Sequence, residues 1–362
     1  MSQQPLPSQF YNPFSPLPSY NPMALLRMMG FLNNRCFSLS ETPPLDDKVA
    51  VITGGQAGIG KEITAQLLLH GISKVYIIAR NESKYVKAND YWHETKGLAV
   101  EDIKSRTEFL ACDLSDIKSI EGVGHELLSK LHRLDILIDN AVLDYTLSAQ
   151  GIESIFAVNH VGHFALTNIL LPLIESTALT HGGARIVVTS SSLHMACHEI
   201  DFATLTSPTR TKAIATIDSS YRYARSKLAN ILFVRELSRR LEERGVRNVY
   251  ANSFYPGNIP TEAMDTWKEL FGIAGVLVKN SFRFIGQSST DAATTAIFLA
   301  ASLDVEKRQL KGEYFIPIAA EGKTSKTAED MDLARRLWDW TDTKVTETLG
   351  KGWETSFNQG HT

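Results

Sequence analysis

The sequence predicts a single α/β domain built on a doubly wound, mainly parallel sheet of seven strands with helices on both faces. From Asp47 onward, short apolar and β-branched runs alternate with longer helical stretches, which is the pattern of successive strand-helix-strand units. A glycine-rich turn directly follows the first of these runs. The chain has 362 residues, of which 43% are hydrophobic, and this is enough for a sizeable core.

The expected strands are dominated by apolar residues, as strands are when helices cover both faces of a sheet. They lie at residues 49–53, 75–79, 106–111, 134–139, 185–190, 249–254 and 312–316. Helices are expected between them, for instance at residues 60–70, 115–132, 155–176, 223–244 and 289–301. No internal repeat is seen, which favours one domain over an array.

Composition and charge argue against several classes of function. The formal net charge is −3 and the two signs are interspersed, so a nucleic-acid partner is not expected. Cys36, Cys112 and Cys197 have neither disulfide-framework nor metal-ligand spacing, so we expect no metal site and an intracellular, reducing compartment. The cytoplasm is favoured over mitochondria or the surface of the endoplasmic reticulum or lipid droplets. No unbroken apolar run reaches the roughly 18 to 20 residues that cross a bilayer.

Two terminal segments are expected to lie outside a domain of residues 47–340. Residues 1–46 are rich in Pro, Ser, Asn and Gln, which is typical of a flexible tail. Arg27 and Arg35, among Met, Leu and Phe, would also suit an organelle-targeting segment or docking to a membrane surface, and both interpretations stay open. Residues 341–362 are expected to form a C-terminal extension.

The glycines after the first strand predict a dinucleotide site. Gly54, Gly58 and Gly60 stand between a strand and a helix, where backbone approaches a pyrophosphate at the helix N-terminus. Three residues separate Gly54 from Gly58, which is longer than the G-x-G-x-x-G form of other Rossmann-type folds. This longer turn resembles that of the short-chain dehydrogenase/reductase family.

The end of the second strand predicts which nicotinamide cofactor is bound. Arg80 stands where an acidic residue would hold the ribose 2′-OH of NAD. An arginine there favours the 2′-phosphate of NADP(H), with NAD(H) less favoured, although a lone arginine after a strand is also a common surface charge.

Tyr223 and Lys227 are four residues apart at the start of an expected helix, so both project from one face. A tyrosine has a pKa near 10, and a neighbouring lysine cation together with an oxidised nicotinamide favours its phenolate. This pair is common by chance, but two further polar positions accompany it. Ser191, with its neighbouring serines as alternatives, follows the fifth strand at the edge where open α/β sheets bind ligands. Asn159 is an isolated amide in an apolar helical segment and needs a buried partner.

These four residues occur in the order of the catalytic tetrad of the short-chain dehydrogenase/reductase family. The resemblance covers residues 47–340 and is closest to the branch of retinol dehydrogenases and the WW-domain oxidoreductase, on segments 159–164, 226–233, 255–257 and 312–315. It implies that Ser191 hydrogen-bonds the substrate oxygen, Tyr223 exchanges a proton and Lys227 orients the ribose, with Asn159 supporting Lys227 through water. The resemblance also places the cofactor against Gly54, Gln56, Gly58, Ile59, Gly60, Arg80, Asp113, Leu114, Asn140, Ala141, Tyr223, Lys227, Pro256, Gly257, Ile259 and Thr261.

Two features of the chain stand apart from this resemblance. Where the family usually has Asn-Asn-Ala-Gly after the fourth strand, this chain has Asp139 first and Val142 last, which introduces a carboxylate and removes a glycine beside the nicotinamide ribose. His160 and His163 have no carboxylate or cysteine to complete a ligand set, so structural roles are expected and no metal.

The sequence therefore predicts an NADP(H)-dependent oxidoreductase of the carbonyl reductase type. Its expected substrate is a small apolar carbonyl compound or alcohol, lipid-like, retinoid- or steroid-like, or polyketide-like, under an apolar lid at residues 258–287. The same segment would equally suit helix packing, a dimer contact or contact with a membrane surface. From the resemblance we expect a homodimer or homotetramer through the helices that contain Ile155 and Tyr223. The alternative is a catalytically weak NADPH-binding regulator or scaffold, and an isomerase or epimerase is less favoured.

Overall fold

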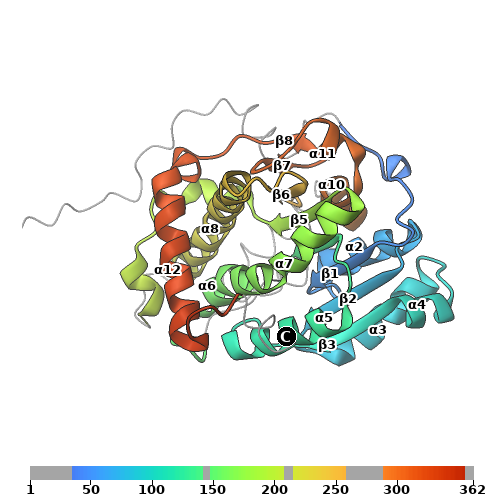
Figure 1. The fold of residues 1–362 in the computed structure, drawn as a ribbon, viewed down its shortest axis with the longest axis horizontal. Helices are drawn as coiled ribbons and strands as arrows, with labels where there is room; N and C mark the ends of the chain where they lie inside the picture. Colours follow the sequence, from blue (N-terminus) through green and yellow to red (C-terminus); the bar gives the residue numbers. More distant parts are fainter. Residues whose placement is uncertain (1–34, 142–146, 208–214, 258–287, 355–362) are drawn as a thin grey trace, which may run out of the picture.

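A sheet of eight strands runs through the centre of the computed structural model, which describes residues 35–141, 147–207, 215–257 and 288–354 (Figure 1). The strand order is β3-β2-β1-β4-β5-β6-β7-β8, parallel throughout except for the last pair. The strands are β1 (Val49–Thr53), β2 (Lys74–Ala79), β3 (Thr107–Ala111), β4 (Ile136–Asp139), β5 (Ala184–Thr189), β6 (Val249–Phe254), β7 (Tyr314–Ile316) and β8 (Ala320–Glu321).

The expected count of seven strands is wrong by one. All seven are present with ends shifted by at most two residues, and β8 is added, pairing antiparallel with β7 through Phe315 opposite Glu321 and Ile316 opposite Ala320. A two-residue strand is too short to produce a periodic pattern in the sequence, so only its pairing reveals it.

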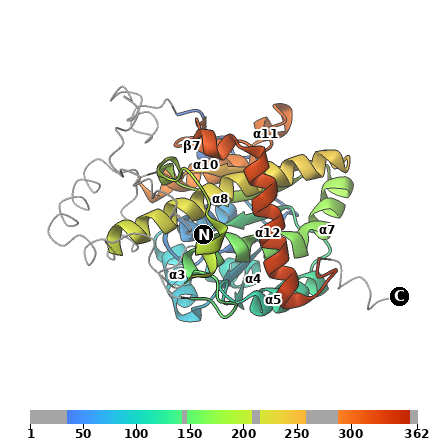
Figure 2. The ribbon, with the colours of Figure 1, turned by 90° about the vertical axis from the view of Figure 1, so that its left-hand side faces the viewer.

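Helices cover both faces of the sheet, and each face has its own apolar core (Figures 1 and 2). One face carries α5 (Ile117–Lys130), α6 (Ser154–Phe156), a π-helix at Ala157–Gly162, α7 (His163–His181), α8 (Ala215–Glu243) and α12 (Met331–Leu349). The other face carries α2 (Gly58–Leu69), α3 (Glu82–Glu94), α4 (Val100–Arg106), α10 (Ser289–Ala301) and α11 (Leu303–Lys307). Short 3-10 turns lie at Leu39–Glu41, Ser192–Ala196, Phe202–Thr206 and Lys326–Glu329.

One continuous helical stretch, Ser154–His181, is the only described helix that is long and apolar enough to cross a membrane. The sequence prediction considered only unbroken apolar runs and did not identify this helix, because polar residues such as Asn159 interrupt it. In the protein, 89% of its most apolar window is buried, so it forms the central helix of one core.

The described ends of the chain pack on the domain. Phe37 is 6% exposed and meets Phe298 of α10 edge to face at 5.3 Å between ring centroids, and Leu45 is fully buried. At the other end, α12 continues through residue 340, and Thr341 and Val345 are fully buried. Apolar contacts therefore hold residues 35–46 and the last turns of α12 against the core.

The strand order determines where a ligand can bind. From β1 the chain builds outward to β2 and β3, and then returns to the other side of β1 with β4. The crevice beyond the carboxyl ends of β1 and β4 is the topological switch point at which open α/β sheets bind dinucleotides.

Candidate active site

The glycine turn after β1 is shaped for close backbone approach. Gly54 and Gly58 have φ values of +66° and +51°, in the left-handed region that favours glycine. A Cβ added to Gly60 would lie 2.3 Å from the carbonyl oxygen of Gly54. The helix α2 begins at Gly58, so the turn leaves a helix N-terminus open to a phosphate.

Thr53 connects this turn to the loop after β4. Its hydroxyl oxygen accepts hydrogen bonds from the backbone N–H of Asn140 at 2.8 Å and of Ala141 at 3.0 Å. The side-chain amide of Asn140 donates to the Thr53 carbonyl at 3.2 Å. Two predicted cofactor residues are thus brought beside the glycines, and this cradle of small residues fits a dinucleotide.

The remaining predicted cofactor residues differ in how they are placed. Arg80 lies exposed after β2 and has no ion pair with any described residue. The Asp113 carboxylate accepts hydrogen bonds from the backbone N–H of Ser115 at 2.9 Å and from its hydroxyl at 2.7 Å. Leu114 is 5% exposed, with its side chain in the core.

Gln56 and Ile59 lie in the turn and in α2, and Pro256 and Gly257 follow β6. Val142, Ile259, Thr261 and the expected lid at 258–287 lie outside the described residues.

Ser191 and Tyr223 meet at the carboxyl edge of the sheet. Ser191 is the second residue after β5. Its hydroxyl caps a 3-10 turn by accepting a hydrogen bond from the backbone N–H of Leu193 at 3.2 Å. Burial raises the pKa of Tyr223, and a hydrogen bond between the Ser191 and Tyr223 side chains acts in the opposite direction. Tyr223 is therefore a neutral phenol at neutral pH in this state of the protein.

Lys227 lies one helical turn further along α8 and is 1% exposed. Its Nζ donates to the carbonyl oxygen of Thr189 at 2.9 Å and lies 5.6 Å from the centre of the Tyr223 ring. Burial lowers the pKa of Lys227 to about 7, and the nearby carboxylate of Asp139 counteracts this shift. The amine of Lys227 is thus held over the ring of Tyr223. With a pKa of about 7, it changes its charge near neutral pH.

Asn159 lies in the π-helix, a distortion that is frequent at functional sites. Its side-chain amide donates to the hydroxyl of Ser226 at 3.0 Å, and that hydroxyl donates to the Tyr223 carbonyl at 2.8 Å. The amide oxygen of Asn159 is buried with no partner among the described residues. Asn159 therefore supports the helix segment that carries Tyr223 and Lys227.

Asp139 lies close to Lys227 and belongs to the same group of buried polar side chains. The sequence identified it only as a departure from the family pattern. The carboxyl is fully buried at the end of β4, and one oxygen accepts from the hydroxyl of Thr167 on α7 at 3.0 Å. The other oxygen has no partner among the described residues. Burial raises the pKa of Asp139 to about 8, and the Thr167 hydrogen bond and Lys227 only partly offset this.

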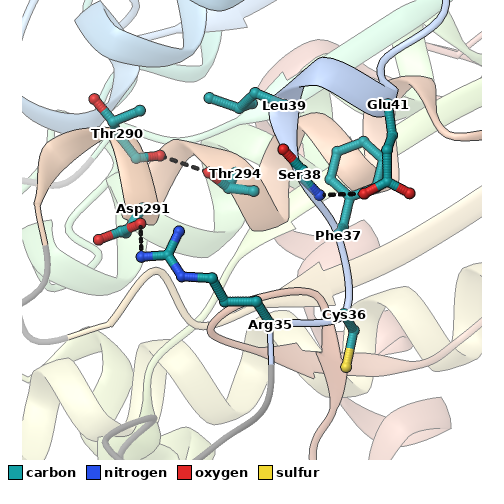
Figure 3. Close-up of a pocket in the computed structure, with 9 residues that line it drawn as sticks. All are labelled: Arg35, Cys36, Phe37, Ser38, Leu39, Glu41, Thr290, Asp291 and Thr294. Carbon is teal, nitrogen blue, oxygen red and sulfur yellow. Dashed lines mark hydrogen bonds and ion pairs between the residues drawn. The ribbon is translucent and has the colours of Figure 1, made fainter.

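Two further features of the described residues bear on ligand binding. The described residues contain no group of three or more His, Cys, Asp or Glu side chains that could hold a metal ion. A cavity of about 490 Å³ lies between residues 35–41 and the start of α10, where Arg35 pairs with Asp291 at 2.8 Å (Figure 3). Because α10 and α8 cover opposite faces of the sheet, this cavity is separate from the site around Tyr223.

Comparisons with known proteins agree with this geometry. Residues 48–198 match the family model described as short chain dehydrogenase. The chain is similar to short chain dehydrogenase/reductase dpchH of Colletotrichum higginsianum, at 36% identity over 85% of this chain and 77% of the relative. It is also similar to retinol dehydrogenase 14 of Mus musculus, at 33% identity over 89% of this chain and 93% of the relative.

A solved structure extends the likeness to the fold. The RhlG/NADP active-site complex of Pseudomonas aeruginosa is 21% identical, with a TM-score of 0.56, over 76% of this chain and 96% of that one. Fold and site together define an α/β oxidoreductase that uses a nicotinamide cofactor. Given relatives above 30% identity over most of its length, the chain belongs to the short-chain dehydrogenase/reductase family.

Proposed function

We propose that this protein is an NADP(H)-dependent carbonyl reductase that acts on small apolar ketones or aldehydes, or on the matching alcohols in the reverse direction. The observation that carries the proposal is the meeting of three groups at the carboxyl edge of the sheet. The Ser191 side chain is close enough to Tyr223 to counteract the rise in its pKa, and the Lys227 amine lies 5.6 Å from the centre of the tyrosine ring.

Each side chain has a role that its chemistry allows. Tyr223 gives its phenolic proton to the substrate oxygen as general acid, and burial favours the protonated phenol that this step needs. Ser191 hydrogen-bonds the same oxygen, and the Lys227 cation stabilises the phenolate that remains. When bound, the cofactor supplies or receives the hydride. Asn159 holds the helix segment of Tyr223 through Ser226.

The preference for NADP(H) over NAD(H) rests on Arg80. Its guanidinium is exposed at the end of β2, the position that reads the ribose 2′ substituent in this fold, and no described carboxylate neutralises it. A free guanidinium suits a phosphate far better than a hydroxyl. The NADP bound in the RhlG complex is consistent with this preference.

The experiment is turnover with NADPH and a panel of apolar ketones, aldehydes and quinones, comparing wild type with Tyr223→Phe. Removing the hydroxyl removes the general acid, so we expect turnover to fall by about 10²- to 10⁴-fold, with the NADPH dissociation constant nearly unchanged. Tyr221→Phe is the matched control, since it removes a half-buried hydroxyl two residues earlier on the same helix and should leave turnover within about twofold.

Other outcomes would point elsewhere. Turnover that survives Tyr223→Phe would contradict the assignment of the acid. Tight NADPH binding without turnover on any carbonyl would favour the alternative of a cofactor-binding regulator or scaffold.

A further inference from the structure

His163 is the first residue of α7, and the sequence predicts only a structural role for it. The side chain is 1% exposed, and both ring nitrogens have partners. Nε2 lies 2.8 Å from the hydroxyl of Thr53 at the end of β1, and Nδ1 lies 3.1 Å from the carbonyl oxygen of Asn159 in the π-helix. The imidazole therefore bridges the cofactor end of the first strand and the segment that holds Asn159.

The partners determine which nitrogen carries the proton. A backbone carbonyl only accepts, so Nδ1 donates to Asn159. The Thr53 oxygen already accepts from the N–H groups of Asn140 and Ala141, which occupies both acceptor positions of a hydroxyl. Its own proton points to Nε2, because the backbone carbonyl on β4 that competes for it is farther away, at 3.5 Å. His163 is thus the neutral Nδ1–H tautomer.

The surroundings keep this tautomer neutral. Burial lowers the pKa of His163 to about 3, and the charge of Lys227 acts in the same direction. Protonation of Nε2 would also break the hydrogen bond that it accepts from Thr53. One directional chain of hydrogen bonds consequently runs from the loop after β4, through Thr53 and His163, to Asn159.

We propose that His163 is a positioning residue of the active site, which couples the Asn140–Ala141 loop beside the nicotinamide end of the cofactor to the π-helix that supports Tyr223. The proposal rests on the proposed function for the identity of the cofactor and of Tyr223. The side-chain amide of the same Asn159 donates to the hydroxyl of Ser226, which donates to the backbone carbonyl of Tyr223, so Asn159 links the imidazole to the helix of the general acid. Movement of the Asn140–Ala141 loop and movement of Tyr223 are then linked through the imidazole of His163.

The chain offers a matched control on the same π-helix. His160 is also 1% exposed, and burial lowers its pKa to about 3 as well. Its Nε2 donates to the hydroxyl of Thr341 on α12, because that hydroxyl gives its own proton to the carbonyl of Leu337. Replacing His160 therefore removes an equally buried imidazole whose Nε2 is bonded to α12 and not to the cofactor loop.

The test compares His163→Leu with His160→Leu. We expect His163→Leu to lower kcat by about tenfold and to raise the dissociation constant of NADPH severalfold. His160→Leu should lower the thermal stability by a similar amount and leave both quantities within twofold. His163→Gln, which can still accept from Thr53, should recover most of the loss in NADPH binding. Equal effects of the two leucine variants on kcat and on NADPH binding would reduce His163 to a packing role and overturn the proposal.

A second measurement does not depend on turnover. In protein with ¹⁵N-labelled histidine rings, the His163 signal, assigned as the one missing from His163→Gln, should show the neutral Nδ1–H tautomer at neutral pH. A neutral Nε2–H tautomer or an imidazolium would overturn the proposed chain. If wild type reduces no carbonyl compound, the proposed function fails, while NADPH binding and the tautomer still decide the role of His163.

Discussion

Asp139 is a residue at which this chain departs from its family, and burial strongly raises the pKa of its carboxyl group. The unfolded side chain ionises near pH 4, whereas the pKa of the folded one is raised to about 8. Between these values the folded state keeps a proton that the unfolded state has lost. The contribution of Asp139 to stability is therefore fully present below about pH 4, falls progressively above it and is lost once the pH has risen through the folded pKa of about 8.

Asp139→Asn should reveal this dependence, since asparagine has nearly the same shape and does not titrate. We expect the stability of Asp139→Asn relative to that of wild type to rise by about 3 kcal/mol between about pH 5.5 and about pH 8, measured by denaturant unfolding. The lowered pKa of Lys227 makes stability rise with pH above 7 in both proteins, and removing the Asp139 charge, which opposes that lowering, strengthens this rise in the variant. A difference in stability that stays constant with pH, or that shifts in favour of wild type as the pH rises, would contradict the buried, protonated Asp139.

Arg80 provides a test of cofactor choice at a single side chain. Charge-assisted hydrogen bonds contribute about 1.5 to 3 kcal/mol, so Arg80→Ala should weaken NADPH binding by about tenfold or more. NADH lacks the 2′-phosphate and should bind equally well to both proteins. Arg336→Ala, an exposed arginine on α12, is the control. Equal losses for NADPH and NADH, measured by fluorescence titration, would show that Arg80 does not contact the 2′ position.

At the scale of elements, the first turn of α2 packs closely against the glycine turn, because the backbone at Gly60 lies next to the carbonyl of Gly54. A methyl group at Gly60 would lie 2.3 Å from the Gly54 carbonyl, so the turn must open to admit it. We expect Gly60→Ala to raise the NADPH dissociation constant by at least about tenfold and to lower the melting temperature.

Gly122, an exposed residue in the middle of α5, is the matched control for this change. A Cβ there meets nothing within 4 Å, and alanine favours helices, so Gly122→Ala should gain about 0.5 to 1 kcal/mol and leave NADPH binding unchanged. If Gly60→Ala behaved like Gly122→Ala in calorimetric titration with NADPH, the turn would not be the cofactor cradle.

The elements themselves were largely predictable, and the exceptions have physical causes. The helix at residues 289–301 agrees with α10 to the residue, because its apolar face and its serine cap are local features. In contrast, α8 begins eight residues before the expected position 223, since nothing in the sequence marks Tyr223 as a helix start. The π-helix around Asn159 has no sequence signature, and α12 was not expected at all.

At the scale of the whole molecule, α12 covers the helices through which a dimer was expected. It crosses α8 and contacts α5 and α7 (Figure 2). Trp338 packs edge to face on Phe164 at 4.8 Å and stacks on Phe233 at 5.8 Å. Part of the outer surface of α7 and α8 is consequently covered by α12 within one chain, while residues such as Leu179 of α7, at 83% exposed, stay open.

Leu337 tests whether α12 is part of the folded core. It is 1% exposed, so Leu337→Ala should lower the free energy of unfolding by about 2 to 5 kcal/mol, while Arg336→Ala should change it by less than about 0.5 kcal/mol. Light scattering should also show more self-association of Leu337→Ala as the apolar surface opens. A loss no larger than that of Arg336→Ala would mean that α12 is not packed as described.

The sequence by itself determined the fold class, the glycine turn and the order of the tetrad residues, because strand-helix alternation and motif spacing are recorded within short stretches of chain. Only the tertiary structure decided which buried polar groups meet. Thr53 and His163 are 110 residues apart, and His160 and Thr341 are 181 apart. A buried polar side chain must find a partner, but its own sequence neighbourhood does not specify which distant group the packing of strands and helices brings to it.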